Sequence, residues 1–294
     1  MHHYCDLHTH SIFSDGTLTP TQLIDLAEEL GLGAVALTDH NTVLGLPEFL
    51  QAAEGKQVEA VPGVEFSVDY GTQELHILAL YIQPAYYDQA MAIADQIQEN
   101  KRKSNIELVE ALNKAGYAIS YEKIKASMPA GEPNRALIAR ELVRCGYVSS
   151  NQEAFATLLS SKHGYYHPPK RIDVFELISF VRSAGAVAVW AHPFLHLKQE
   201  EQIRQFLPRA VAAGLQGMEV RYSLYTPEQT RLAEALAKEY GLLPSGGSDF
   251  HGENKPLIHL GTGNGDLKVP LEFCEAMKKL ADSQGMVSGK GKNA

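Results

Sequence analysis

Residues 6–11 read Asp-Leu-His-Thr-His-Ser and continue a short expected strand, residues 4–7, near the start of the chain. In an extended segment, side chains two positions apart point the same way, so His8 and His10 can reach one site. The same spacing recurs near the other end of the chain, where Asp249 and His251 are two apart. Imidazoles and carboxylates paired in this way are typical ligands of divalent metal ions.

Short apolar runs alternate with amphipathic stretches outward from this segment. Strands that alternate with helices predict parallel strands joined by crossover helices, and one α/β barrel of about 250 residues fits the 294-residue chain. The expected strands are residues 4–7, 34–38, 59–61 running toward 65, 75–82, 186–190, 217–221 and 242–243, the last ended by Pro244. The expected helices are residues 21–30, 42–53, 174–184, 200–213 and 227–240.

Residues 86–169 break this alternation and are expected to form a mostly helical insertion. Its expected helices are residues 89–115, 121–126, 134–145 and 152–159. The barrel is then a discontinuous domain made of residues 1–85 and 170–282. Residues 283–294 are small, polar and rich in Gly and Lys, which predicts a disordered tail.

The charge of the chain limits its partners. The whole chain has a net charge of −9, which argues against a basic surface for long duplex nucleic acid. Residues 99–170 differ, because eleven Lys and Arg stand against seven Glu, a net charge of +4. Two interpretations of this stretch stay open, an ordinary solvated helix surface and a lid that faces an anionic substrate.

The rest of the composition indicates a globular protein of a reducing compartment. Hydrophobic residues make up 45% of the chain, and charged residues interrupt every apolar stretch before it reaches the ~18 residues that cross a bilayer. The start of the chain has no signal-peptide pattern. The three cysteines are far apart and form no CxxC pair, so we expect free thiols and a cytoplasmic protein without membrane partners.

Most of the expected strands end in, or contain, a side chain of the metal-ligand type. The C-terminal ends of parallel barrel strands face one mouth, so these side chains are expected to meet there. A lone His is more often a satisfied core residue, but the recurrence at successive strands predicts a site for a divalent ion such as Mn²⁺, Fe²⁺ or Zn²⁺. The residues concerned are His8, His10, His40, Glu65, His76, His192, Asp249 and His251. His2, His3 and His259 are interpreted as incidental, and His163, His167 and His196 stay unassigned.

The motifs, taken in order, resemble the polymerase-and-histidinol-phosphatase (PHP) family of phosphoesterases. They are D-L-H-T-H-S, S-D-G, T-D-H-N, P-G-V-E-F, the strand His, A-H-P and S-D-F-H. The resemblance implies a distorted (β/α)₇ TIM-like barrel with up to three metal ions. It assigns His8, His10, Glu65 and Asp249 to the first ion, Glu65, His76 and His192 to the second, and Asp15, His40 and His251 to the third. Some relatives have a histidine where Asp15 stands, so the third position is expected to be weaker or to prefer Mn²⁺.

Three segments of the insertion read Asn134-Arg-Ala-Leu-Ile-Ala-Arg140, Cys145-Gly-Tyr-Val-Ser149 and Lys162-His-Gly-Tyr-Tyr166. They resemble one subgroup of this family, the 3′,5′-nucleoside bisphosphate phosphatases, some of whose relatives are 5′-to-3′ exoribonucleases. The resemblance implies phosphate contacts from Arg135 and Lys162, with Asn134 beside them, and the alternative for both cations is a surface salt bridge or a solvated charge. Two departures concern substrate choice. Phe194-Leu-His196 stands where many relatives have Gly-Arg-Tyr, and Tyr225 stands where relatives often have a histidine.

The resemblance implies hydrolysis of a phosphate ester by a metal-activated hydroxide, with Glu65, Asp249, His192 and His251 as catalytic ligands. The alternative role for His192 or His251 is that of a general acid, which protonates the leaving oxygen. Asp6 and Asp39, beside the ligating histidines, are expected to orient imidazole rings.

The predicted function is therefore removal of the 3′-phosphate from a small nucleotide, with action on short single-stranded RNA as an extension. The alternatives are a histidinol-phosphate phosphatase and a non-catalytic, metal-binding regulatory domain. No GxxxxGK[ST] loop or GxSxG motif occurs, so neither a P-loop enzyme nor a serine hydrolase is supported.

Overall fold

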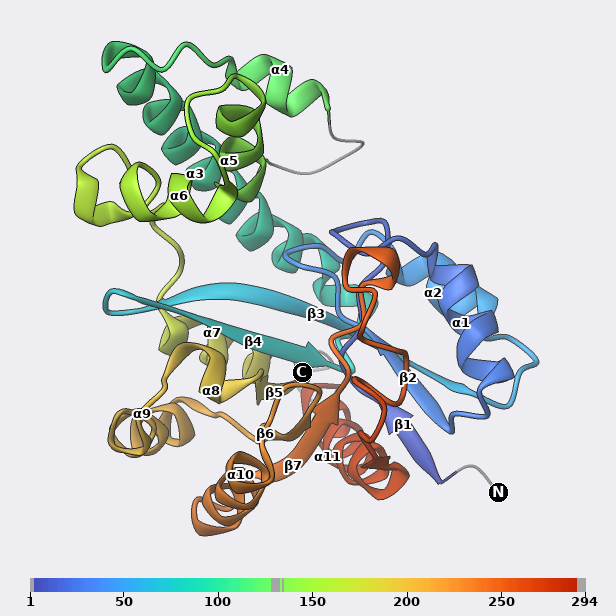
Figure 1. Ribbon diagram of the computed structural model, residues 1–294. Coiled ribbons are helices and arrows are strands. Elements are labelled where there is room, and N and C mark those ends of the chain that lie inside the picture. The colour runs from blue at the N-terminus through green and yellow to red at the C-terminus, as the bar shows by residue number, and fades with distance from the viewer. Residues whose placement is uncertain (1–2, 128–132, 134, 290–294) are drawn as a thin grey trace. The chain divides into compact units, whose positions relative to one another are not determined.

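Eight strands form one sheet in the order β7-β6-β5-β4-β3-β2-β1-β8, which curves into a nearly closed barrel (Figure 1). The computed structural model describes residues 3–127, 133 and 135–289. The strands are β1 Tyr4–Asp6, β2 Ala34–Leu37, β3 Glu59–Tyr70, β4 Gln73–Leu80, β5 Val187–Trp190, β6 Gly217–Tyr222, β7 Leu243–Gly247 and β8 Val269–Pro270. The predicted α/β barrel is confirmed, and β8 is a strand that the sequence analysis did not predict.

The prediction of parallel strands is wrong at β4. The strands β1, β2 and β3 pair in parallel, as do β5, β6 and β7, but β4 is antiparallel to both β3 and β5. The reason is a tight turn, since β3 runs on to Tyr70, Gly71 turns with φ 61°, and β4 returns from Gln73. His76 lies near the start of this reversed strand, which brings it to the edge where the parallel strands end.

The expectation that Pro244 ends the seventh strand is also wrong. Pro244 lies within β7 opposite Met218, and the strand continues to Gly247. The end of β7 lies against β1, because Leu7 donates to the carbonyl of Gly246 (3.1 Å). A Cβ on Gly247 would lie 2.4 Å from the Cβ of His8, so glycine permits the approach that nearly closes the barrel.

The helices of the barrel unit follow the strands on the outside of the sheet, and most lie where they were predicted. Thr19 and Thr226 cap their helices through capping boxes, each followed by a proline in the first turn, which fixes where these helices begin. The helices are α1 Pro20–Glu29, α2 Leu46–Ala52, α7 Val174–Ser183, α8 Pro193–His196, α9 Glu200–Ala213, α10 Pro227–Glu239 and α11 Leu271–Gly289.

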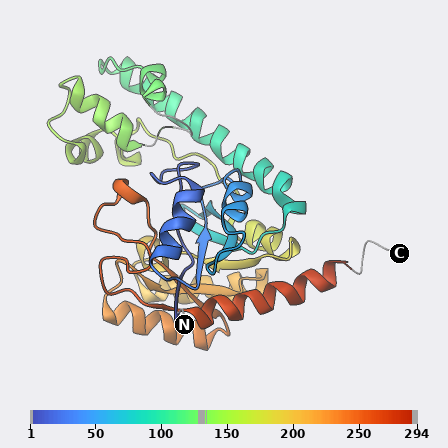
Figure 2. The same cartoon turned by 90° about the vertical axis from the view of Figure 1, so that its right-hand side faces the viewer.

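Three helical segments differ from the prediction. The helix α2 begins at Leu46 rather than at residue 42, because residues 41–45 form turns before it. The four-residue α8 is too short to leave a periodic pattern in the sequence. The predicted disordered tail is wrong for residues 283–289, since α11 continues through them and ends at Gly289 (Figure 2). Residues 290–294 of that predicted tail lie outside the described residues.

The core of the barrel is apolar and includes two of the cysteines. Cys5, Val189 and Met277 belong to one cluster of buried residues that joins β1, β5 and α11. The second core cysteine is Cys274. Cys5, Cys274 and the third cysteine, Cys145, all carry free thiols, as predicted. Within the described part of the chain, no helix is long and apolar enough to cross a membrane.

Residues Ala94–Arg171 form a second compact unit, distinct from the unit made of Met1–Ile93 and Ile172–Ala294. The long helix α3 (Tyr87–Lys114) begins in the barrel unit and ends in the second. Its buried residues Leu108 and Leu112 share an apolar cluster with Ile138 and Leu142. The other helices of this unit are α4 Tyr121–Ala126, α5 Arg135–Arg144 and α6 Asn151–Thr157.

Candidate metal site

All nine side chains that the family resemblance assigns to metal ions meet at the ends of the barrel strands. The backbones of these strand ends hydrogen-bond to one another, which fixes the spacing of the side chains. Asp249 donates its N–H to the carbonyl of His8 (2.9 Å), and Asn41 donates to the carbonyl of Glu65 (2.9 Å). The nine residues are His8, His10, Asp15, His40, Glu65, His76, His192, Asp249 and His251.

Glu65, on β3, is the centre of the group and is completely buried. Its two carboxylate oxygens face five imidazole rings. Oε2 lies 2.9 Å from Nδ1 of His40, 3.2 Å from Nε2 of His8 and 3.4 Å from Nε2 of His10, and Oε1 lies 2.8 Å from Nδ1 of His76 and 3.0 Å from Nε2 of His192. Burial alone would raise the pKa of Glu65, but the neighbouring charges of His40, His8 and His76 outweigh it and hold that pKa well below its usual range.

The buried polar atoms at this centre fit a bound cation. A buried polar atom without a hydrogen bond costs about 1–3 kcal/mol, so native proteins keep few of them. Here several lie together without a hydrogen bond of good geometry, and their lone pairs converge. They are Nε2 of His8, Nε2 of His10, Nδ1 of His40 and Oε2 of Glu65. Neutral imidazoles and carboxylates are the donor set that Mn²⁺, Fe²⁺ and Zn²⁺ accept.

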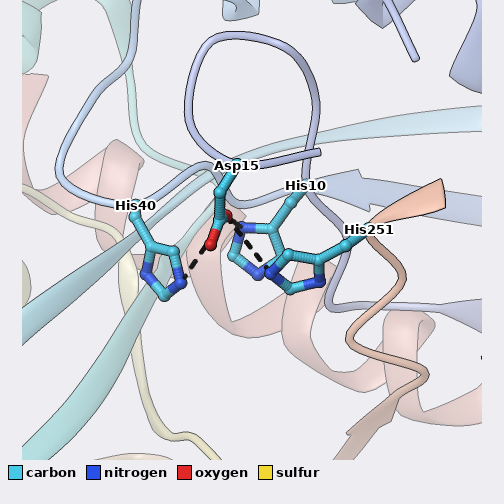
Figure 3. A group of neighbouring side chains, drawn as sticks. All are labelled: His10, Asp15, His40 and His251. Carbon is cyan, nitrogen blue, oxygen red and sulfur yellow. Dashed lines mark ion pairs between the residues drawn. The ribbon is translucent and has the colours of Figure 1, made fainter. Parts of the chain in front are cut away.

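Figure 3 shows the group that contains Asp15, whose carboxylate points between three imidazoles. Oδ1 of Asp15 lies 3.2 Å from Nε2 of His251 and 3.9 Å from both Nδ1 of His10 and Nε2 of His40. The side chain of Asp15 is 52% exposed, so this is the open side of the site. Burial, with repulsion from His251 and His40, lowers the pKa of His10 to about 3, which keeps its ring in the neutral, ligating form.

The backbone is strained at two residues of the site, His192 and Asp249. His192 has φ 30° and Asp249 has φ 58°, both in the left-handed region that residues other than glycine seldom adopt. Such a conformation costs about 1–3 kcal/mol per residue and persists where the surrounding structure imposes it, most often at functional sites. The strain therefore marks the ends of β5 and β7 as part of the site.

Glu219 is a buried residue of the site that the sequence analysis missed. It lies on β6, where its Oε1 accepts from Nδ1 of His8 (2.9 Å) and its Oε2 accepts from the backbone N–H of His192 (2.6 Å). A proton on Nδ1 leaves Nε2 of His8 free to bind a metal ion. The signal in the sequence is an acid inside the apolar run Gly-Met-Glu-Val, residues 217–220.

The roles predicted for Asp6 and Asp39 are wrong, because neither carboxylate contacts an imidazole that it was expected to orient. Asp6 accepts from the backbone N–H groups of His8 (3.3 Å) and Ser248 (2.8 Å). Asp39 accepts from the N–H of Ser11 (2.8 Å) and from nearby serine hydroxyls. Both carboxylates hold the loops at the barrel mouth, whereas Glu219 orients the ring of His8.

Glu219→Gln is expected to weaken metal binding by about 10- to 100-fold, because an amide no longer holds the proton of His8 as a carboxylate does. Metal content after dialysis against a graded chelator measures this change. Glu234→Gln on the surface of α10 is the matched control and is expected to bind metal normally. Equal metal retention in both variants would contradict the orienting role of Glu219.

Asp249 is held from its other side by two residues that the sequence analysis did not assign to it. Its Oδ2 accepts from the hydroxyl of Tyr222 (2.8 Å) and from Nζ of Lys255 (2.6 Å). Its Oδ1 therefore faces His10 (3.2 Å) and His8 (3.7 Å). One oxygen is thus fixed by the protein and the other is left for an ion.

Arg135 and Lys162, which are expected to contact substrate phosphate, lie in the second unit. The guanidinium of Arg135 stacks on the ring of Tyr166, 4.3 Å from its centroid, and donates to the carbonyl of Leu159 (3.2 Å). Lys162 is exposed. Asn134 lies outside the described residues.

Comparison with known proteins places these features in a family. Residues 6–165 match the family model described as PHP domain. The chain is 33% identical over 246 residues to a 5′-3′ exoribonuclease of Haemophilus influenzae, covering 84% of this chain and 89% of the relative. It is 32% identical over 248 residues to a 3′,5′-nucleoside bisphosphate phosphatase of Chromobacterium violaceum, covering 84% and 86%. A solved structure from Bifidobacterium adolescentis, assigned as a metal-dependent phosphoesterase, superposes with a TM-score of 0.76 at 31% identity, covering 94% of this chain and 96% of the other.

Proposed function

Because this chain belongs to the PHP domain family and is a phosphoric ester hydrolase, we propose that it removes the 3′-phosphate of nucleoside 3′,5′-bisphosphates such as 3′-phosphoadenosine 5′-phosphate. Short single-stranded RNA with a 5′-phosphate is the second substrate class. The observation that carries the proposal is the buried carboxylate of Glu65 surrounded by five imidazoles.

Up to three divalent ions are proposed to bind at this site, with Mn²⁺ as the expected ion. His8, His10, Glu65 and Asp249 would hold the first ion, and Glu65, His76 and His192 would hold the second. Asp15, His40 and His251 would hold the third at the open side. When bound, such ions lower the pKa of a coordinated water toward 7 and neutralise phosphoryl oxygens.

The protein's own contribution is to hold these ligands rigidly and to keep the inner part of the site dry. Glu65, His8 and His10 are fully buried, so water reaches the group from the side of Asp15. We propose that the scissile phosphate enters on that side. Glu219 and Lys255 fix one atom each of His8 and Asp249, so little reorganisation is needed when charge develops on the phosphate.

The substrate class is inferred from the relatives' names and from the charge of the insertion. By their names, one of these two relatives acts on RNA and the other on a nucleoside bisphosphate. Both of these substrates carry more phosphate groups than a simple monoester does. The net charge of +4 over residues 99–170 suits such a substrate. The net charge of −9 over the whole chain favours a small molecule or a short strand over long duplex nucleic acid.

Product analysis tests the proposal. The metal-loaded protein is given 3′-phosphoadenosine 5′-phosphate, AMP, histidinol phosphate and a 5′-phosphorylated RNA oligomer in parallel, and the products are separated by chromatography. We expect the bisphosphate to be the best small substrate and to yield AMP and inorganic phosphate. Fastest release from histidinol phosphate would favour that alternative function, and no release from any substrate at full metal occupancy would favour the regulatory alternative.

Arg135→Ala is expected to raise KM for the bisphosphate about tenfold or more, while KM for p-nitrophenyl phosphate changes little, because only the bisphosphate has a second phosphate to bind. Steady-state kinetics on both substrates measures the change in KM for each of them. Arg144→Ala, at the exposed end of α5, is the matched control. Since Arg135 stacks on Tyr166, thermal unfolding must show that the variant is folded, and equal KM changes on both substrates would contradict the phosphate contact.

A further inference from the structure

His196 is a histidine to which neither the family resemblance nor the comparisons assign a role. It is the last residue of α8, which starts directly after His192 at the end of β5. The turn is closed by the N–H of Leu195 donating to the carbonyl of His192 and that of Leu197 donating to Pro193, both at 3.0 Å. Residues four apart on a helical turn share one face, so the rings of His192 and His196 point the same way.

The two rings form a triangle with a third. The centroid of His196 lies 4.9 Å from that of His76 and 5.3 Å from that of His192, and the rings of His76 and His192 are 5.1 Å apart. One ring nitrogen from each of the three lies within 4.8 Å of the other two. This spacing is compatible with a shared ion at Zn–N distances of about 2.0–2.1 Å after small ring movements.

Two nitrogens of this triangle are unsatisfied. Nε2 of His196 and Nδ1 of His192 are buried and have no hydrogen-bond partner among the residues that the structure describes. A histidine that only fills the core is normally hydrogen-bonded through its ring, because an orphaned buried nitrogen is costly. The site's central carboxylate does not serve them, since Oε1 of Glu65 faces Nε2 of His192 (3.0 Å) and Nδ1 of His76 (2.8 Å).

We propose that His196 is a metal ligand that forms, with His76 and His192, an all-imidazole position for a divalent cation at the edge of the site. The inference rests on the proposed metal-dependent function. Because a neutral imidazole has one free lone pair, this position would be an alternative to the one that His76 and His192 are proposed to form with Glu65, and the two would not be filled together.

Three imidazole nitrogens are a donor set that suits Zn²⁺ better than Mn²⁺. The partly exposed carboxylate of Glu74 lies at the edge of this triangle, with its Oε1 3.6 Å from Nε2 of His76. The ring contact between Phe194 and Tyr225, with centroids 5.0 Å apart, holds α8 in the place that this ligation needs.

Zinc binding by the full chain tests this proposal without reference to activity. The protein is stripped with a chelator and titrated with Zn²⁺ by calorimetry, as wild type, His196→Phe and His259→Phe. Phenylalanine keeps the ring but offers no nitrogen, and His259 is an exposed histidine of the same unit. We expect His196→Phe to bind one equivalent of Zn²⁺ at least about tenfold more weakly, while His259→Phe binds as wild type does.

Unchanged stoichiometry and affinity in His196→Phe would overturn the proposal while leaving the proposed function intact, whereas a wild-type protein that binds no divalent ion would remove both. His196→Gln guards against a folding defect caused by phenylalanine. Its Co²⁺-loaded form is expected to show a visible absorption spectrum different from that of wild type, and an identical spectrum would also overturn the proposal.

Discussion

Replacing Glu65 by Gln is expected to lower kcat/KM for phosphate release by at least about 10³-fold, which corresponds to about 4 kcal/mol of transition-state stabilisation. The amide keeps the shape of the side chain but removes the negative charge that faces five imidazoles. It offers one oxygen instead of two, so it cannot join two ions as the carboxylate is proposed to do. Initial-rate kinetics at saturating Mn²⁺ measures the loss.

The fold is expected to tolerate this change, because Gln removes a buried charge without leaving a cavity. The unfolding midpoint in excess chelator should therefore move by only a few degrees. Glu74→Gln is the matched control, since Glu74 is a partly exposed acid at the edge of the same site, 3.6 Å from Nε2 of His76. Near-normal turnover in Glu65→Gln would contradict the central place given to Glu65.

Asp6→Ala is expected to destabilise the barrel by about 3–5 kcal/mol, because it leaves several buried donors without an acceptor. The carboxylate is fully buried and joins three segments of the mouth. It accepts from the N–H of His8 (3.3 Å), from the N–H of Ser248 (2.8 Å) and its hydroxyl, and from the N–H of Gly261 (2.8 Å). A loss of this size lowers the unfolding midpoint by about 5–8 °C in a protein of this length.

Thermal unfolding in excess chelator measures this effect, since bound metal would otherwise stabilise the native state and mask it. Asp25→Ala removes an acid whose side chain is 58% exposed on α1, and it is expected to change stability by no more than about 0.5 kcal/mol. If the two variants unfolded at the same temperature, this would contradict the claim that the hydrogen bonds of Asp6 stabilise the barrel.

The metal-type ligands were predictable from the sequence because each stands in a local pattern. His8 and His10 share one side of an extended segment, and His40, His192 and Asp249 each follow an apolar run. What these patterns omit is strand direction. The turn at Gly71 reverses β4, so His76 reaches the mouth from the start of a strand rather than from its end.

The supporting residues could not be predicted because their roles depend on partners far away in the chain. Glu219 serves His8, which lies 211 positions earlier, and no local pattern joins them. His196 lies in a helix of only four residues, too short for a hydrophobic period. Pro244 ended the predicted strand on local grounds, whereas the structure keeps it within β7, paired with β6.

Metal content and turnover measured on the same sample test the central claim most directly. The protein is stripped stepwise with a chelator, its bound metal is determined at each step, and phosphate release from 3′-phosphoadenosine 5′-phosphate is assayed before and after Mn²⁺ is returned. We expect turnover to fall in proportion to the metal removed, to vanish in the stripped protein and to recover with Mn²⁺. Undiminished turnover in protein that retains no metal would contradict a metal-dependent site built on Glu65.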